Sequence, residues 1–270
     1  MKDHLGQIVA EAPDRLRAKS LAREYVQARI LQMLQEQGAF RRWIFHGGTA
    51  LRFLYGLPRY SEDLDFALEK PGSEPDFTNL MESVRRGFQA EAYDVDVKVR
   101  QRTAVSSAFV LFGGLYHELG LSPRRTEVLS VKVELDTKPP ASGQTETSVI
   151  RRYTAILNFK HYDKSSLLSG KLHALLARPY TKGRDLYDLF WYLSDRNWPE
   201  PNIPFLAAAL RQTRWPGPQL TKDNWRSVIA RKLGRLDWKK AVADVRPFLE
   251  RPAELDQMTK ENILLLLKRA

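Results

Sequence analysis

Apolar residues recur near the helical period along the first part of the chain, and this pattern predicts a long helix over residues 14–38. Leu21, Tyr25, Ile30 and Leu34 recur at intervals close to that period. Gly38 is expected to end the helix, because glycine readily takes up the left-handed conformation found at helix C-termini.

Shorter apolar and alternating stretches predict strands between further helices. Residues 93–101 alternate valine with polar residues, as a half-buried strand does. The other expected strands are residues 43–45, 62–68, 107–112 and 128–136, and the other expected helices are residues 49–55 and 77–92. Two loops are expected, at residues 71–75 and, as a polar and mobile segment, at residues 139–147.

From residue 164 onward the pattern is helical, with breaks at Pro179, at residues 199–201 and 216–218, and at Pro247 or Pro252. The patterns together predict an α+β protein. A mixed β-sheet with flanking helices would occupy residues 1–160, and a basic α-helical domain would occupy residues 161–270.

Charge separates these two parts. The whole chain has a net charge of +11, yet residues 1–150 hold 20 basic and 20 acidic side chains. Residues 151–270 hold 23 basic and 12 acidic side chains, so the entire surplus lies there. A basic surface attracts polyanions such as RNA, although a solvated helical surface would have the same composition.

Composition also excludes several classes of protein. The chain has no cysteine, which excludes disulfides and cysteine-ligated zinc and favours a cytoplasmic location. The first residues lack the apolar core of a signal peptide, and no apolar run is long enough to span a bilayer. We therefore expect no association with a membrane.

The most informative stretch is residues 46–66. Gly47, Gly48 and Thr49 form a turn ahead of a short helix, whose free N–H groups and positive dipole end suit a phosphate. Asp63 and Asp65 follow two positions apart on a predicted strand and so share one face. Two adjacent carboxylates repel each other unless a cation lies between them, and Mg²⁺ prefers such oxygen ligands.

This pattern resembles the nucleotidyltransferase superfamily, and within it the AbiEii/AbiGii toxin family, which includes the MenT-like toxins. The resemblance covers the Gly-Gly-Thr-Ala-Leu-Arg and Ser-Glu-Asp-Leu-Asp-Phe elements that start at Gly47 and Ser61. A second block, residues 170–178 and 183–189, is similar to the family's Lys-Leu-x-Ala-Leu-x-x-Arg and Arg-Asp-x-x-Asp-Leu elements.

The resemblance implies two Mg²⁺ ions held by Asp63 and Asp65, with an NTP as substrate. A third carboxylate would come from residues 130–136, where Glu134 is preferred and Asp136 is the alternative. Lys132, on the same face, would lie near the triphosphate. A cross-strand ion pair at the sheet surface is the alternative interpretation of this strand.

In the second block the resemblance makes Lys171 and Asp185 catalytic. Lys171 would hold the triphosphate as a point charge, and Asp185 would orient Lys171 or the acceptor. Asp188 lies one turn further along and could take that role instead. Secondary phosphate contacts are expected from Arg59, Arg178 and Arg184, and His46 is a further candidate for contact with the nucleotide.

The resemblance implies a toxin that adds nucleotides to an RNA acceptor, foremost the tRNA 3′ end, and so blocks translation. A cognate antitoxin is expected as its partner. Two other functions remain open: nucleotidyl transfer to a small molecule such as an aminoglycoside, and a non-catalytic module that binds nucleic acid or a partner protein.

Overall fold

A computed structural model describes residues 2–71, 76–102 and 104–268, and the chain divides into two compact units. The first unit comprises residues 1–56, 60–139 and 146–161, and the second comprises residues 57–59, 140–145 and 162–270. A boundary at residue 160 would put residues 57–59 and 140–145 in the N-terminal domain, whereas both segments belong to the second unit. The loop expected at residues 71–75 lies largely outside the described residues.

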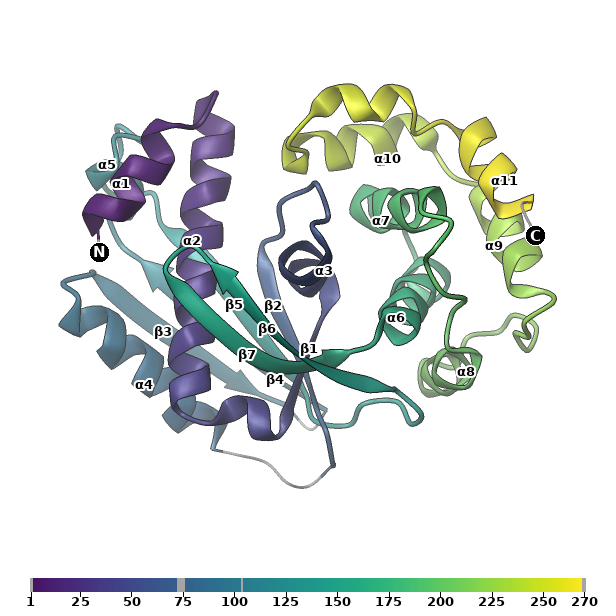
Figure 1. The fold of residues 1–270 in the computed structure, drawn as a ribbon, viewed down its shortest axis with the longest axis horizontal. Coiled ribbons are helices and arrows are strands. Elements are labelled where there is room, and N and C mark those ends of the chain that lie inside the picture. Colours follow the sequence, from purple (N-terminus) through teal and green to yellow (C-terminus); the bar gives the residue numbers. More distant parts are fainter. Residues whose placement is uncertain (1, 72–75, 103, 269–270) are drawn as a thin grey trace. The chain divides into compact units, whose positions relative to one another are not determined.

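The first unit is built on a seven-stranded mixed sheet of order β3-β4-β5-β2-β1-β7-β6 (Figure 1). Strand β2 pairs antiparallel with β1 and parallel with β5. The middle of the sheet therefore carries the predicted Asp63 and Asp65. The strands are β1 (Trp43–His46), β2 (Asp63–Leu68), β3 (Val95–Gln101), β4 (Val105–Phe112), β5 (Leu129–Asp136), β6 (Thr145–Arg152) and β7 (Ala155–Tyr162).

Helix α2 (Arg15–Glu36) packs against α1 (Lys2–Ala10), α4 (Phe77–Ala90) and β5, and it confirms the long helix predicted from the apolar period. Gly38 follows it in the left-handed conformation, with φ of 74°. Aromatic rings fill the core, where the Phe45 centroid lies 5.3 Å from that of Phe66 and 5.1 Å from that of Phe159. The remaining helices of this unit are η1 (Ala39–Arg41), α3 (Gly47–Tyr55) and α5 (Leu115–Glu118).

From Lys164 onward the second unit consists of helices and the loops between them, as the proline-broken pattern predicts. Its helices are α6 (Lys164–Ala177), α7 (Gly183–Ser194), α8 (Ile203–Gln212), α9 (Trp225–Leu233), α10 (Trp238–Val245), η2 (Arg246–Phe248), η3 (Pro252–Asp256) and α11 (Lys260–Lys268). Side chains cap several N-termini: Asp163 accepts a hydrogen bond from Ser166 N, and Asn202 accepts one from Phe205 N. Helix α6 packs on α7, α8 and α9, and α7 packs on α10 and α11.

Two parts of the fold depart from the sequence prediction. Residues 145–162 form the β6–β7 hairpin, whose edge strand is mostly exposed and polar and so lacks the apolar alternation by which strands are recognised. The loop expected at residues 139–147 is shorter, because β6 begins at Thr145, and it is hydrogen-bonded from Asn202 Nδ2 to Ser142 O at 2.8 Å and from Gln144 N to Ser166 Oγ at 3.0 Å.

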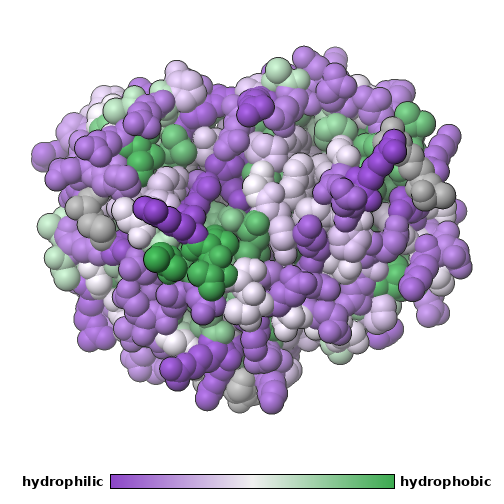
Figure 2. Space-filling view, in the orientation of Figure 1, coloured by the Kyte–Doolittle hydropathy of each residue, from purple (hydrophilic) through white to green (hydrophobic). Residues whose placement is uncertain are grey.

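Surface side chains are predominantly hydrophilic in the view of Figure 2, with small apolar patches between them. Within the described residues, no helix is both long and apolar enough to cross a membrane.

Candidate functional site

The turn between β1 and α3 requires glycine for two reasons. Gly47 has φ of 80°, a region that side chains with a Cβ atom rarely adopt. A Cβ atom at this position would also lie 2.2 Å from Oδ2 of Asp65, far inside contact distance. The Asp65 carboxylate therefore packs directly against the first residue of α3, where the helix dipole is positive.

Thr49 ties this turn to β2. Its hydroxyl donates a 2.5 Å hydrogen bond to the main-chain oxygen of Asp63, and its side chain is fully buried. The hydroxyl of Thr49 thus positions the turn, and a phosphate contact from Thr49 would have to come from its main-chain N–H. Gly48 is buried beside it, so Gly47 is the more accessible member of the glycine pair.

Strand β2 presents Asp63 and Asp65 on one face. Both are half-buried, whereas Leu64 and Phe66 point into the core. His46 is the cross-strand partner of Asp65 in the β1–β2 register and precedes α3 as its N-cap residue. The predicted arrangement of two carboxylates and a helix N-terminus is therefore formed within the first unit.

Strand β5 brings its polar face beside these carboxylates. In the parallel register Asp63 is opposite Lys132, and Asp65 is opposite Glu134. Lys132 Nζ lies 2.7 Å from Oε1 of Glu134, so the two form an ion pair within β5 and not the cross-strand pair considered as the alternative. The contact engages both side chains, and the metal role of Glu134 and the phosphate role of Lys132 stay predictions.

Asp136 lies opposite Ala67, further along the sheet. Burial raises the pKa of its carboxyl, and the N–H of Lys138, which donates a 2.9 Å hydrogen bond, and the charge of His46 act in the opposite direction.

The carboxylates of this site fit Mg²⁺ as a pair of ligands. Among the described residues no group of three or more histidine, aspartate or glutamate side chains is gathered for a metal ion, and Glu134 as the third ligand stays a prediction. Mg²⁺ is commonly bound by one or two carboxylates together with substrate phosphates and water. Asp63 and Asp65 suit that kind of site.

In the second unit, α6 and α7 bring together a chain of buried charges. Lys171 Nζ lies 2.6 Å from Oδ2 of Asp188 and 3.6 Å from Oδ1 of Asp185. Asp188 is fully buried, and Asp185 is nearly so. The predicted proximity of Lys171 and Asp185 is present, but Asp188 is the nearer partner.

Arg59 does not have the accessible position expected of a phosphate contact. It belongs to the segment of residues 57–59 and donates two 2.6 Å hydrogen bonds, from Nε and Nη2, to the two carboxylate oxygens of Asp188. Its side chain is 3% exposed, so it cannot offer a phosphate the accessible contact predicted for it. The sequence signal for this pairing is weak, because the two residues are 129 positions apart.

Electrostatics hold Asp188 in its charged form. Burial opposes ionisation, yet the charges of Arg59 and Lys171 outweigh it and keep the pKa of Asp188 below its ordinary value. Burial likewise opposes the charge on Arg59, and Asp188 reverses this and raises the arginine's pKa. The three side chains stabilise one another as a unit.

The other two predicted arginines also have partners within the second unit. Arg178 forms an ion pair with Asp185. The Arg184 guanidinium carbon lies 4.3 Å from the centroid of the Phe248 ring, a cation–π contact. Both therefore stabilise the helical unit, and a phosphate would have to compete with these partners.

Comparison with known proteins gives a family and a fold. The family described as nucleotidyl transferase AbiEii toxin, type IV TA system, matches residues 29–260. Among solved structures, JHP933 from Helicobacter pylori shares 20% sequence identity, with a TM-score of 0.57 and coverage of 92% of this chain and 90% of that one.

A second H. pylori protein, described as a candidate nucleotidyltransferase, also shares 20% identity, with a TM-score of 0.52 and coverage of 92% and 95%. At this identity the two structures establish the fold alone. No match is found among curated proteins. Because the family match spans most of the sequence, the chain belongs to the AbiEii family of nucleotidyltransferase toxins of type IV toxin–antitoxin systems.

Proposed function

We propose that this toxin transfers a nucleotide from an NTP to an RNA acceptor, foremost the 3′ end of tRNA, and thereby blocks translation. The observation that supports this most strongly is the pairing of two carboxylates with a helix start: Asp63 and Asp65 share one face of β2, and Asp65 packs against Gly47. A cation on the carboxylates and a phosphate at the N-terminus of α3 are complementary.

The reaction is a displacement at phosphorus. An acceptor hydroxyl oxygen forms a bond to the α-phosphorus and gives up its proton to solvent, the bond to the bridging oxygen of pyrophosphate breaks, and pyrophosphate leaves with that electron pair. Mg²⁺, when bound, would neutralise charge on the phosphates. Asp63 and Asp65 would hold it, Gly47 leaves room for Asp65, and the N–H groups at the start of α3 would orient the nucleotide.

Within the second unit, Lys171 is proposed as a phosphate contact. Asp188 and Asp185 hold its ammonium group in a defined position, which lowers the entropy lost when the lysine contacts an anion. Asp188 is anchored by Arg59, so in this proposal it positions Lys171, whereas Asp185 lies closer to the surface through its pair with Arg178.

The choice of RNA as the acceptor is supported by charge. The surplus of 11 basic side chains lies in residues 151–270, and α9 ends with Arg231 and Lys232. A polyanionic acceptor would bind such a surface in preference to a small cationic amine. As a member of a toxin–antitoxin family, the protein is expected to have a cognate antitoxin.

The decisive experiment is incubation of the protein with each labelled NTP, Mg²⁺ and total RNA, followed by sizing of the labelled species. We expect label in RNA of tRNA size, lost on addition of a chelator. Label in an aminoglycoside but not in RNA would overturn the proposal in favour of small-molecule transfer. Absence of transfer with every acceptor would favour a non-catalytic binding module.

A further inference from the structure

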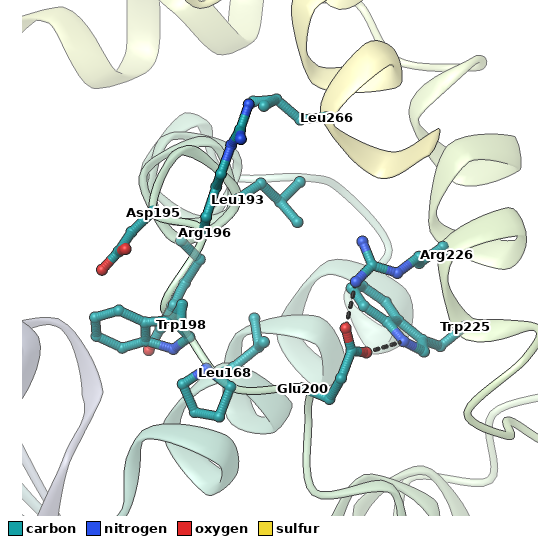
Figure 3. Close-up of a pocket in the computed structure, with 11 residues that line it drawn as sticks. Leu168, Leu193, Asp195, Arg196, Trp198, Glu200, Trp225, Arg226 and Leu266 are labelled. Carbon is teal, nitrogen blue, oxygen red and sulfur yellow. Dashed lines mark hydrogen bonds and ion pairs between the residues drawn. The ribbon is translucent and has the colours of Figure 1, made fainter. Parts of the chain in front are cut away.

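A cavity of about 510 Å³ opens in the second unit beside the loop that joins α7 to α8 (Figure 3). All of its lining residues belong to this unit. Its volume lies in the range of pockets that hold small organic ligands, about 300–1,000 Å³. None of the residues assigned above to nucleotide or metal binding lines it.

One wall of the cavity is aromatic. The Trp198 ring is contacted edge-on by Trp191 and Tyr192, with centroid distances of 4.9 and 4.5 Å. The ammonium nitrogen of Lys164 lies 4.7 Å from the centroid of the Trp198 ring. These contacts hold the indole in one orientation, and the ring is only half-buried because it borders the cavity.

Charged groups form the rim. Glu200 accepts a 2.8 Å hydrogen bond from the indole N–H of Trp225 and forms an ion pair with Arg226, as the dashed lines in Figure 3 show. Glu200 and Arg226 thus neutralise each other. Arg196 differs from them, because its exposed guanidinium forms neither an ion pair nor a side-chain hydrogen bond with any residue that the structure describes.

We propose that this cavity binds one unpaired nucleotide of a single-stranded segment of the RNA acceptor. A planar base fits beside Trp198, since every base offers a π-face for stacking. The phosphate fits Arg196, whose planar fork matches phosphate oxygens. Asp195, also at the rim, can accept a hydrogen bond from an exocyclic amino group of a base.

The inference rests on the proposed RNA-directed function and specifies which part of the acceptor the helical unit holds. The basic surplus of residues 151–270 favours an RNA ligand over an apolar peptide. A surface that acted through charge alone would favour a duplex, because its charge density is higher. A stacking cavity instead requires a base that is not paired.

The test measures binding of a short, fluorescently labelled single-stranded RNA oligonucleotide of mixed sequence to the full chain, without NTP or Mg²⁺. The same sequence as a duplex is measured in parallel. We expect the single strand to bind more tightly and to quench tryptophan fluorescence. Trp198→Leu should weaken its binding by about tenfold or more, the usual effect of losing one base–aromatic stack.

Two further variants test the cavity independently, in case Trp198→Leu does not fold. Leu193→Trp fills the cavity while keeping Trp198, and Arg196→Gln removes the free charge. Both should weaken binding of the single strand, and Arg196→Gln should also lower the log–log salt slope by about 0.7. Arg211→Gln is the matched control, since Arg211 is an exposed arginine on α8 that does not line the cavity.

Two results would overturn the inference: equal losses for Arg196→Gln and Arg211→Gln, or normal single-strand binding by Leu193→Trp. The binding test is independent of the transfer assay. If RNA becomes labelled but the cavity variants bind the oligonucleotide normally, the cavity inference fails and the proposed function stands. If no RNA becomes labelled but the cavity variants lose single-strand binding, the proposed function fails and the cavity inference stands.

Discussion

The ammonium nitrogen of Lys171 lies 2.6 Å from a carboxylate oxygen of Asp188, a residue that the Arg59 guanidinium holds from the other side. Asp188 thus serves two cations in a fully buried position. Asp185 is 3.6 Å from the same lysine and pairs with Arg178. The two aspartates therefore have separable roles, which a sequence spacing of three residues cannot distinguish.

Asp188→Asn should destabilise the protein strongly. The change leaves Arg59 without its hydrogen-bonded carboxylate and leaves Lys171 with Asp185 alone, and breaking a buried ion pair typically costs about 3–5 kcal/mol. Asp185→Asn should lower the free energy of unfolding by less, because Lys171 retains Asp188. It should nevertheless reduce the rate of transfer. Urea unfolding and transfer rates, with the exposed Asp223→Asn as control, decide between these roles. Equal stability losses for the two variants would contradict this assignment.

Gly47→Ala should abolish transfer, whereas Gly56→Ala should not. Both glycines lie at ends of α3 with positive φ, of 80° and 70°, so each alanine incurs a similar backbone cost of about 1–2 kcal/mol. Only at Gly47 would the new Cβ collide with Asp65, at 2.2 Å, while at Gly56 no atom lies within 4 Å. Thermal melts and transfer assays of both variants provide the comparison. An active Gly47→Ala enzyme would show that the position of Asp65 is unimportant.

Asp63→Asn and Asp65→Asn should each reduce transfer by several orders of magnitude and leave the fold intact. Each change removes a negative charge from the proposed Mg²⁺ ligands while conserving side-chain volume. The exposed Asp96→Asn on β3 serves as the control. The measurements are transfer rate against Mg²⁺ concentration and circular dichroism. Chelator-resistant transfer by the wild-type protein would argue against a metal-dependent reaction.

Stability should fall as pH decreases below about 6.5, and His173 should contribute to this loss. Burial and the charge of Arg178 lower the pKa of its imidazole below the ordinary value of 6.5. Between the two pKa values the unfolded chain binds more protons than the folded one, so the free energy of unfolding rises with pH. His173→Gln should flatten this rise. Chemical unfolding at about pH 5 and about pH 8 measures it, and an unchanged slope in the variant would exclude His173 as a source.

RNA binding should weaken steeply with added salt, with a log–log slope of about −0.7 to −0.9 for each phosphate neutralised. Charge reversal at Arg231, Lys232 or Arg235, near the end of α9, should weaken RNA binding and leave NTP binding nearly unchanged. Filter binding at several salt concentrations provides the test. A flat salt response would favour a small-molecule acceptor over RNA.

The sequence alone determined the class of fold, the nucleotidyltransferase resemblance and the principal elements of both parts. These follow from local information: apolar periodicity, proline breaks and the spacing of Gly47, Asp63 and Asp65 are all short-range features. For the same reason the shared face of the two aspartates followed directly from the two-residue repeat of a strand.

Only the tertiary structure decided which side chains engage one another. The Arg59–Asp188 pair joins residues 129 positions apart, the Lys132–Glu134 pair engages the expected third ligand, and Trp198 borders a cavity. Charged side chains reach their partners through packing of distant segments, and sequence spacing contains no information about that packing. The edge strand β6 escaped prediction because its stability comes from pairing with β7 and not from an apolar pattern of its own.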